Sequence, residues 1–336
     1  MNEKILNNIN DVLSNNKNII LIPHSSPDAD ALGSCLGLYH FFKDENNVSI
    51  ISPNEYTDIL NFLPGSESVI VFDNEKEKST NLLRNADVIF TLDFNSLSRA
   101  RNISNLISKS SAKIIMIDHH ENPDKYADIM ISDSKMSSTC EMVYDFICLL
   151  DKNKINNKIA TCLYTGIVAD TGSFRYPSTT SKTLKAGSEL INYGVNVTEI
   201  FEKLHNNFQF KRLKLLGAAI NNFKKIDGLP VLYTSITDDD QKTNSFKKGD
   251  SEGFVNFGLS VTGILCSVLF IEKKDEGLIK ISFRSKGDFK VNIFASRYFS
   301  GGGHEHASGG ISKLSLIETE KKFIKDIKDH IKENYE

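Results

Sequence analysis

Three short segments of this chain combine aspartate and histidine in a way that favours metal chemistry. The first holds His24, Asp28 and Asp30 within seven residues. The second is the run 118–120, Asp-His-His, and the third ends at Asp170. Carboxylate oxygens and imidazoles gathered from separate segments are the ligands that a pair of divalent cations needs. The pattern therefore predicts a metal-dependent hydrolase.

Taken singly, some of these residues have plainer interpretations. Asp93 ends an apolar run and alone would be read as a residue that caps a turn. Asp170 precedes Thr-Gly, which is a common way for a helix to end, so it gains weight only from the others. The dense segment around His24 and the Asp-His-His run are much less often accidental. These two segments carry the prediction.

A second group of candidate residues lies near the C-terminus. The segment 301–310 is expected to be a glycine-rich loop and contains His304. Glycines let backbone N–H groups come close to a phosphate or nucleoside. A glycine-rich segment by itself is more often just a turn, but Arg284 on a predicted strand adds a guanidinium that can bind phosphate oxygens in bidentate fashion. This region is therefore the candidate substrate site.

The first half of the chain alternates short apolar runs with helical patterns, which predicts a mostly parallel, doubly wound sheet of the α/β class. Helical patterns cover residues 31–42 and 82–85. In such sheets ligands bind beyond the carboxyl ends of the strands, and His24, Asp93 and Asp118 all fall there. The predicted strands are residues 18–22, 48–51, 69–72, 88–92 and 114–117.

The pattern changes twice further along the chain. From about residue 138 to 223 it is helical, with spacing of the i, i+3, i+4 kind. After Gly228 strand-like and helical runs mix, which predicts a smaller α+β domain. We therefore expect a metal-binding catalytic domain, a helical connector and a substrate-binding domain, at residues 1–192, 193–227 and 228–336.

The bulk composition excludes several classes of protein. A length of 336 residues, 40% of them hydrophobic, suits about two globular domains. The net charge of −3 gives no basic field for long duplex nucleic acid. The five cysteines form no C-x-x-C pair, and no apolar run is long enough for a membrane span. We expect a cytoplasmic protein without a membrane partner.

Together these residues resemble the DHH phosphoesterase superfamily. Its motifs match the His-x-x-Pro-Asp-x-Asp segment, the isolated Asp93, the Asp-His-His triplet and Asp170, in order. The Arg-Ser-Lys strand and the Gly-Gly-Gly-His segment resemble the DHH-associated C-terminal domain. Ser26 departs from the pattern, since many relatives have Asn there. Within this superfamily the chain looks like the NrnA type, bifunctional oligoribonucleases (nanoRNases) and pAp phosphatases.

The resemblance implies a role for each candidate residue. One metal ion would be held by His24, Asp28 and Asp93. The second would be held by Asp30, Asp93, His119 and Asp170, which makes Asp93 the bridging ligand. The residues that would take part in catalysis are His120, Asp93 and Arg284. The residues that would contact substrate are His120, Arg284, Gly302, Gly303 and His304.

The expected activity is hydrolysis by a water that two metal ions activate. Mixed carboxylate and imidazole ligands favour Mn²⁺, two per active site, with Mg²⁺ or Co²⁺ as substitutes. The expected substrates are short oligoribonucleotides, cleaved to mononucleotides, and 3′-phosphoadenosine 5′-phosphate (pAp), converted to AMP in a cleft between the domains. A homodimer is compatible with the sequence.

Three alternatives stay open. One is a phosphodiesterase acting on linear or cyclic dinucleotides such as pApA or c-di-AMP. Another is a RecJ-like exonuclease on longer single strands, which needs a basic groove and aromatic stacking platforms. The third is a nucleotide-binding regulatory module with a decayed metal site, which the intact ligand set disfavours.

Overall fold

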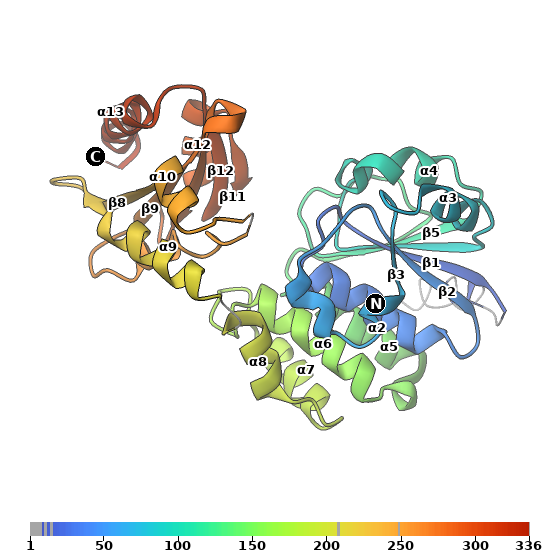
Figure 1. Cartoon of the computed structure of the whole chain (residues 1–336). Helices are drawn as coiled ribbons and strands as arrows, with labels where there is room; N and C mark the ends of the chain where they lie inside the picture. The colour runs from blue at the N-terminus through green and yellow to red at the C-terminus, as the bar shows by residue number, and fades with distance from the viewer. Residues whose placement is uncertain (1–8, 10–11, 14–15, 207–208, 248, 336) are drawn as a thin grey trace. The chain divides into compact units, whose positions relative to one another are not determined.

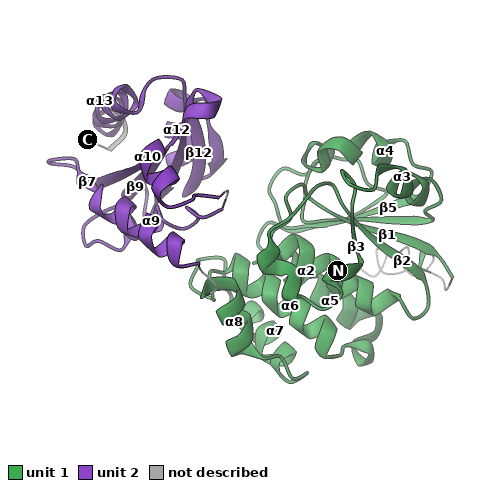
Figure 2. Ribbon diagram, viewed as in Figure 1, with its two compact units in different colours: residues 1–207 green, residues 208–336 purple. Residues whose placement is uncertain are grey.

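The computed structural model describes residues 9, 12–13, 16–206, 209–247 and 249–335. It divides into two compact units, residues 1–207 and 208–336, shown in green and purple in Figure 2. The segment expected to be a connector contains α8 (Val197–His205) and α9 (Phe210–Asn221), and the division falls between these two helices. Each unit is described separately below.

A six-stranded, all-parallel sheet forms the centre of the first unit (Figure 1). Its strand order is β3-β2-β1-β4-β5-β6, so the direction in which strands are added reverses between β1 and β4. Such a reversal opens a crevice at the carboxyl ends of the two strands. The expected doubly wound α/β sheet is confirmed. Its strands are β1 (Asn18–Pro23), β2 (Asn47–Ser52), β3 (Val69–Val71), β4 (Val88–Leu92), β5 (Lys113–Asp118) and β6 (Ile129–Ser132).

Helices cover both faces of this sheet (Figure 1). Successive side chains of a strand point to opposite faces, and β1 shows the consequence. Ile19 and Leu21 pack against the helices on one face (the first group), whereas Ile20 and Ile22 pack against the helices on the other face (the second group). Both faces are therefore apolar, as a sheet buried on two sides requires. The first group is α2 (Ala29–Phe42), α5 (Thr139–Asp151), α6 (Asn157–Asp170) and α7 (Ser181–Ile191); the second is α3 (Lys76–Arg84) and α4 (Ser104–Ser108).

Glycines bring α2 and α6 unusually close together. A Cβ atom on Gly33 of α2 would lie 2.5 Å from the carbonyl oxygen of Cys162 in α6. A Cβ on Gly37 would lie 2.6 Å from a methyl carbon of Leu163. At Gly33 the backbones of the two helices therefore meet directly, and at Gly37 the side chain of Leu163 packs against the backbone of α2. This contact fixes the start of α2 relative to the end of α6.

The second unit is a mixed sheet in the order β11-β12-β10-β9-β8-β7. Only β8 and β9 run parallel; the other neighbours are antiparallel. α12 and α13 pack on one face, and α9 packs on the other. The expected α+β class is thus correct. The elements are β7 (Lys224–Lys225), β8 (Val231–Ile236), α10 (Asp238–Thr243), α11 (Asn256–Leu259), β9 (Cys266–Lys273), β10 (Leu278–Ser285), α12 (Val291–Phe299), β11 (Gly302–His304), β12 (Ala307–Ser312) and α13 (Leu316–Tyr335).

The glycine-rich segment differs from its expected form. It is a β-hairpin, β11 and β12, rather than a loop. A Cβ on Gly301 would lie 2.0 Å from the carbonyl oxygen of Gly309, and one on Gly310 would lie 2.9 Å from Phe299. The glycines therefore serve close packing within the sheet and against α12. Among the described helices, none is both long and apolar enough to cross a membrane.

Candidate metal centre

All six predicted metal ligands meet in the first unit, at the edge of the sheet where its parallel strands end. His24 follows β1, Asp93 follows β4 and His119 follows β5. Asp30 lies in the first turn of α2, and Asp170 is the last residue of α6. The strand ends and the α2–α6 contact together gather the ligands. The possible ligand atoms form three overlapping groups, and within each group all the atoms lie within 4.8 Å of one another. The groups are His24, Asp28 and Asp93; Asp30, His119 and Asp170; and Asp93, His119 and His120.

Asp93 contacts both halves of the cluster. Its Oδ2 lies 3.4 Å from His24 Nε2, which is itself 3.7 Å from Asp28 Oδ2. Its Oδ1 lies 3.5 Å from His119 Nε2. Asp93 is 2% exposed and has φ of +67°, a conformation that few residues other than glycine, asparagine and aspartate adopt. The strand end thus turns one carboxylate so that each oxygen serves a different group.

His119 joins the remaining carboxylates. Its Nε2 lies 3.2 Å from Asp170 Oδ2 and 3.9 Å from Asp30 Oδ2. Asp30 is buried on α2, and the side chain of Asp170 is only partly covered at the end of α6. A second group of ligands therefore surrounds His119, with one edge open to solvent.

Backbone carbonyls set the tautomer of both candidate histidine ligands. His24 Nδ1 lies 2.9 Å from the oxygen of Ser25, and His119 Nδ1 lies 3.3 Å from the oxygen of Met136. A carbonyl oxygen only accepts, so each Nδ1 carries the hydrogen that it donates. In the neutral ring Nε2 then holds a lone pair that points toward the carboxylates. Histidine ligands of metals are commonly oriented in this way.

His120 is held differently. Its Nδ1 donates to Asp118 Oδ1 at 2.7 Å, and its backbone N–H donates to Asp118 Oδ2 at 3.1 Å. Nδ1 is also 3.7 Å from Asp93 Oδ1, but its hydrogen bond to Asp118 makes it a poor metal ligand. Asp118, which is fully buried, belongs to the predicted Asp-His-His run, but the resemblance assigns it no role. Its place in the Asp-His-His run was the signal that could have identified it.

The carboxylates and imidazoles of the cluster lie so close together, and so deeply buried, that they shift one another's pKa values. Burial, followed by repulsion from Asp93, raises the pKa of Asp30 well above its usual range. Burial and repulsion from Asp30 and Asp93 raise the pKa of Asp170 to about 9. Burial opposes charge on His24, yet hydrogen bonds to Asp28 and Asp93 raise its pKa to about 10. His24, Asp30 and Asp170 therefore hold protons more tightly than usual, and a bound cation would reduce the same repulsion among the carboxylates. The oxygen and imidazole donors fit divalent metal ions.

Metal affinity should consequently rise with pH. At pH 7 the raised pKa values of His24 and Asp170 keep both groups protonated, and each must lose its proton to bind a metal. We expect the apparent Mn²⁺ affinity of the metal-stripped protein to increase steadily from pH 6 to pH 8, about tenfold per unit for each proton displaced. Calorimetry in buffers of different ionisation enthalpy measures the released protons. An affinity independent of pH would contradict this account.

A side chain at position 166 should weaken metal binding, although Gly166 itself cannot be a side-chain ligand. A Cβ there would lie 2.2 Å from Cys140 Sγ and 2.9 Å from Asp30 Oδ1. We expect Gly166→Ala to displace the Asp30 carboxylate and weaken Mn²⁺ binding by roughly tenfold or more, the scale of other changes around metal ligands. Gly217→Ala on α9 is the control, because nothing lies within 4 Å of its Cβ position. Equal Mn²⁺ affinities in the two variants would refute the prediction.

Apart from His120, which lies in the first unit beside the metal cluster, the predicted substrate residues lie in the second unit. Arg284 on β10 and His304 on β11 are both paired with Ala307 of β12. Directly opposed residues of a sheet share a face, so these two side chains lie on the same face, two strands or ~10 Å apart. Gly302 and Gly303 precede His304 on β11. The structure thus groups the guanidinium, the imidazole and the glycines at one end of this sheet.

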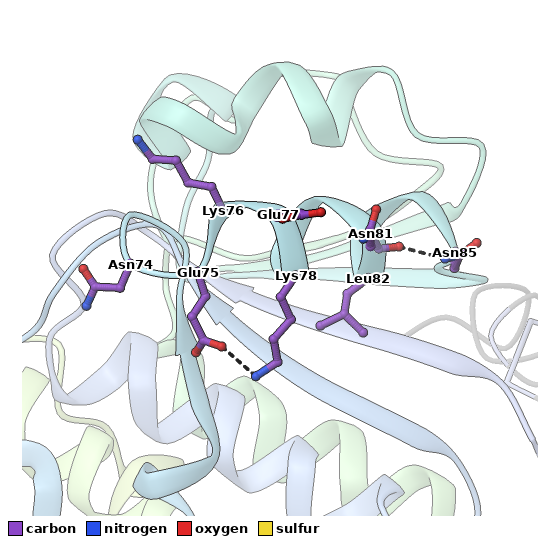
Figure 3. A pocket seen from close by; sticks show the side chains of 8 residues that line it. All are labelled: Asn74, Glu75, Lys76, Glu77, Lys78, Asn81, Leu82 and Asn85. Carbon is purple, nitrogen blue, oxygen red and sulfur yellow. Dashed lines mark hydrogen bonds and ion pairs between the residues drawn. The ribbon is translucent and has the colours of Figure 1, made fainter.

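A pocket elsewhere in the first unit has a different character. It has a volume of about 630 Å³ and follows α3 on the outside of the fold (Figure 3). Its Glu75 and Lys78 side chains pair with each other at 2.8 Å. None of the predicted site residues lines it, and it holds no cluster of metal-ligating groups. The lining residues are Asn74, Glu75, Lys76, Glu77, Lys78, Asn81, Leu82 and Asn85.

Known proteins resemble this chain along most of its length. It is 33% identical over 306 residues to the "Bifunctional oligoribonuclease and PAP phosphatase NrnA" of Bacillus subtilis, covering 87% of this chain and 88% of the relative. The protein of the same name from Thermus thermophilus is 30% identical, covering 93% and 90%. The crystal structure of an exopolyphosphatase-related protein from Bacteroides fragilis is 36% identical, with a TM-score of 0.94 and coverage of 98% and 97%.

Family comparisons divide the chain as its two units do. The "DHH family, N-terminal domain" matches residues 18–167, which include five of the six predicted ligands. The "DHHA1 domain" matches residues 228–333, which include Arg284 and His304. Members of this family are metal-dependent phosphoesterases. The chain belongs to the DHH phosphoesterase family and carries a DHHA1 domain in its second unit.

Proposed function

We propose that this protein hydrolyses short oligoribonucleotides to mononucleotides and converts pAp to AMP. The observation that carries the proposal is the intact ligand cluster around Asp93 in a chain that matches two NrnA proteins over about nine tenths of its length. A decayed regulatory relative would be expected to have lost at least one carboxylate. We also propose that it works in the cytoplasm, where its free cysteines would stay reduced.

The two groups of ligand atoms support a two-metal site. His24, Asp28 and Asp93 would hold one ion. Asp30, His119 and Asp170, together with Asp93, would hold the other. Mixed oxygen and imidazole donors favour Mn²⁺ in both positions, with Mg²⁺ or Co²⁺ as substitutes. When bound, the ions would supply Lewis acidity toward water and toward the phosphoryl oxygens.

The chain's own residues would orient the substrate and handle its charge. Asp118 fixes the ring of His120 through Nδ1, so the imidazole is held in one orientation at the edge of the cluster. His120 would face a phosphoryl oxygen through Nε2, and it would donate a hydrogen bond there in the form in which both ring nitrogens carry a hydrogen. Arg284 would bind phosphate oxygens with its planar guanidinium. His304, Gly302 and Gly303 would contact the nucleoside or a second phosphate.

Substrate length tests the proposal. The chain has a net charge of −3, so nucleotides beyond the reacting end should gain little from long-range attraction. We expect kcat/KM with Mn²⁺ to be highest on oligoribonucleotides of a few residues and to fall with length, with release of one mononucleotide at a time. A time course on a labelled RNA ladder measures this, with pAp, pApA and c-di-AMP assayed in parallel.

The possible outcomes separate the candidate functions. Equal efficiency on a long strand and a trimer would support a RecJ-like exonuclease instead. Turnover of c-di-AMP or pApA far above that of RNA trimers and pAp would assign the protein to the dinucleotide phosphodiesterases. If none of these substrates were hydrolysed although Mn²⁺ was bound, the nucleotide-binding regulatory module would be the remaining alternative.

A further inference from the structure

Thr139 is a buried residue that touches two of the candidate ligands at once. It is the first residue of α5 and is 0% exposed. Its hydroxyl donates to Asp93 Oδ1 at 2.9 Å, and its backbone N–H donates to Asp30 Oδ2 at 2.7 Å. The next residue, Cys140, donates its N–H to Asp30 Oδ1 at 2.8 Å. The start of α5 therefore contacts a carboxylate from each group.

We propose that Thr139 is a positioning residue for the metal site, an inference that rests on the proposed function. Its hydroxyl selects which oxygen of Asp93 faces each group of ligands. With Oδ1 bound by Thr139 and facing His119, Oδ2 is left directed at His24. A carboxylate can rotate about its last side-chain bond, and a single donor on one oxygen removes that freedom. Such outer contacts tune metal binding without touching the metal.

A buried carboxylate holds the start of α5 in place. Glu141, 1% exposed, accepts hydrogen bonds from the hydroxyl of Ser137 at 2.5 Å and from that of Thr183 at 2.9 Å. Its backbone N–H donates to the side chain of Ser138, the N-cap of α5. Because Thr183 belongs to α7, the segment before Thr139 is fixed from two elements. The hydroxyl of Thr139 is thus presented from a rigid base, as a positioning role requires.

Removal of the hydroxyl alone tests the proposal. Thr139→Val keeps the shape of the side chain and the backbone N–H to Asp30, while Thr139→Ser keeps the hydroxyl. We expect Val to weaken Mn²⁺ binding by ~10- to 100-fold, the usual effect of losing a partner of a ligand, and Ser to bind nearly as the wild type does. Calorimetric titration of metal-stripped protein with Mn²⁺ alone gives the affinities. Melting temperatures in EDTA report the fold.

Matched variants separate positioning from packing. Thr165→Val removes a buried hydroxyl of α6 that donates to the carbonyl of Thr161, and it should leave Mn²⁺ affinity unchanged. Thr139→Ala, which cannot crowd α5, should repeat the loss seen with Val. In an Asp93→Asn background Thr139→Val should have a much smaller effect, since the contact is already altered.

Two results would overturn the inference. One is wild-type Mn²⁺ affinity in Thr139→Val or Thr139→Ala. The other is an equal loss in Thr139→Ser, which would make side-chain shape rather than the hydroxyl responsible. Because the titration uses the metal alone, a failure to hydrolyse RNA or pAp would refute the proposed function without affecting this result.

Discussion

Replacement of Asp93 by asparagine is expected to abolish turnover, even with Mn²⁺ in excess. The substitution removes a negative charge whose two oxygens face different groups of ligands, 3.4 Å from His24 Nε2 and 3.5 Å from His119 Nε2. Both proposed metal sites therefore weaken together. A loss of several kcal/mol in transition-state stabilisation corresponds to a rate at least ~10³-fold lower. Initial rates on an RNA trimer, at saturating Mn²⁺, measure the effect.

The backbone makes asparagine a fair test at this position. Asp93 has φ of +67°, a region that asparagine tolerates nearly as well as aspartate does. Asp28→Asn is the comparison, because the Asp28 side chain is 57% exposed and belongs to one group only. We expect Asp28→Asn to lose less activity and to recover part of it at high Mn²⁺. Near-normal rates in Asp93→Asn would refute the bridging role.

Much of the fold could be predicted because its physical signals are local. Buried parallel strands are continuous apolar runs, and β4 was predicted with the bounds that it has. β6 was missed because it is a short edge strand whose residues Ile129 to Ile131 are only half-buried. The β11–β12 hairpin was missed because glycine has a low strand preference. In the structure β12 pairs with β10 on one side and with β11 on the other, contacts that a local sequence pattern does not reveal.

The candidate ligands could also be identified from the sequence, since each lies at or near the end of a recognisable apolar run. Their partners could not. Thr139 is 46 residues from Asp93, and nothing in its local sequence indicates that its hydroxyl meets that carboxylate. The contact depends on how α5 packs beside β4 and α2. Similarly, the role of Gly166 depends on the separation between α6 and Asp30. Such residues are set by tertiary packing.

Arg284→Ala should impair catalysis without loss of metal. Arg284 belongs to β10 in the second unit, whereas every candidate ligand lies between residues 24 and 170 in the first. We expect kcat/KM to fall by ~10²-fold or more, the scale of a lost charged contact in the transition state. Bound Mn²⁺, measured by elemental analysis after gel filtration, should equal that of the wild type.

Arg297→Ala is the matched control for this variant. Arg297 lies on α12 of the same unit, and its exposed guanidinium pairs with Glu333 at 2.6 Å. An exposed ion pair of this kind contributes little to stability, so this variant should keep both its metal and its kcat/KM. If Arg284→Ala were depleted of Mn²⁺, Arg284 would support the core instead of the substrate. If both arginine variants kept full kcat/KM, the proposal that Arg284 contacts the substrate would be wrong.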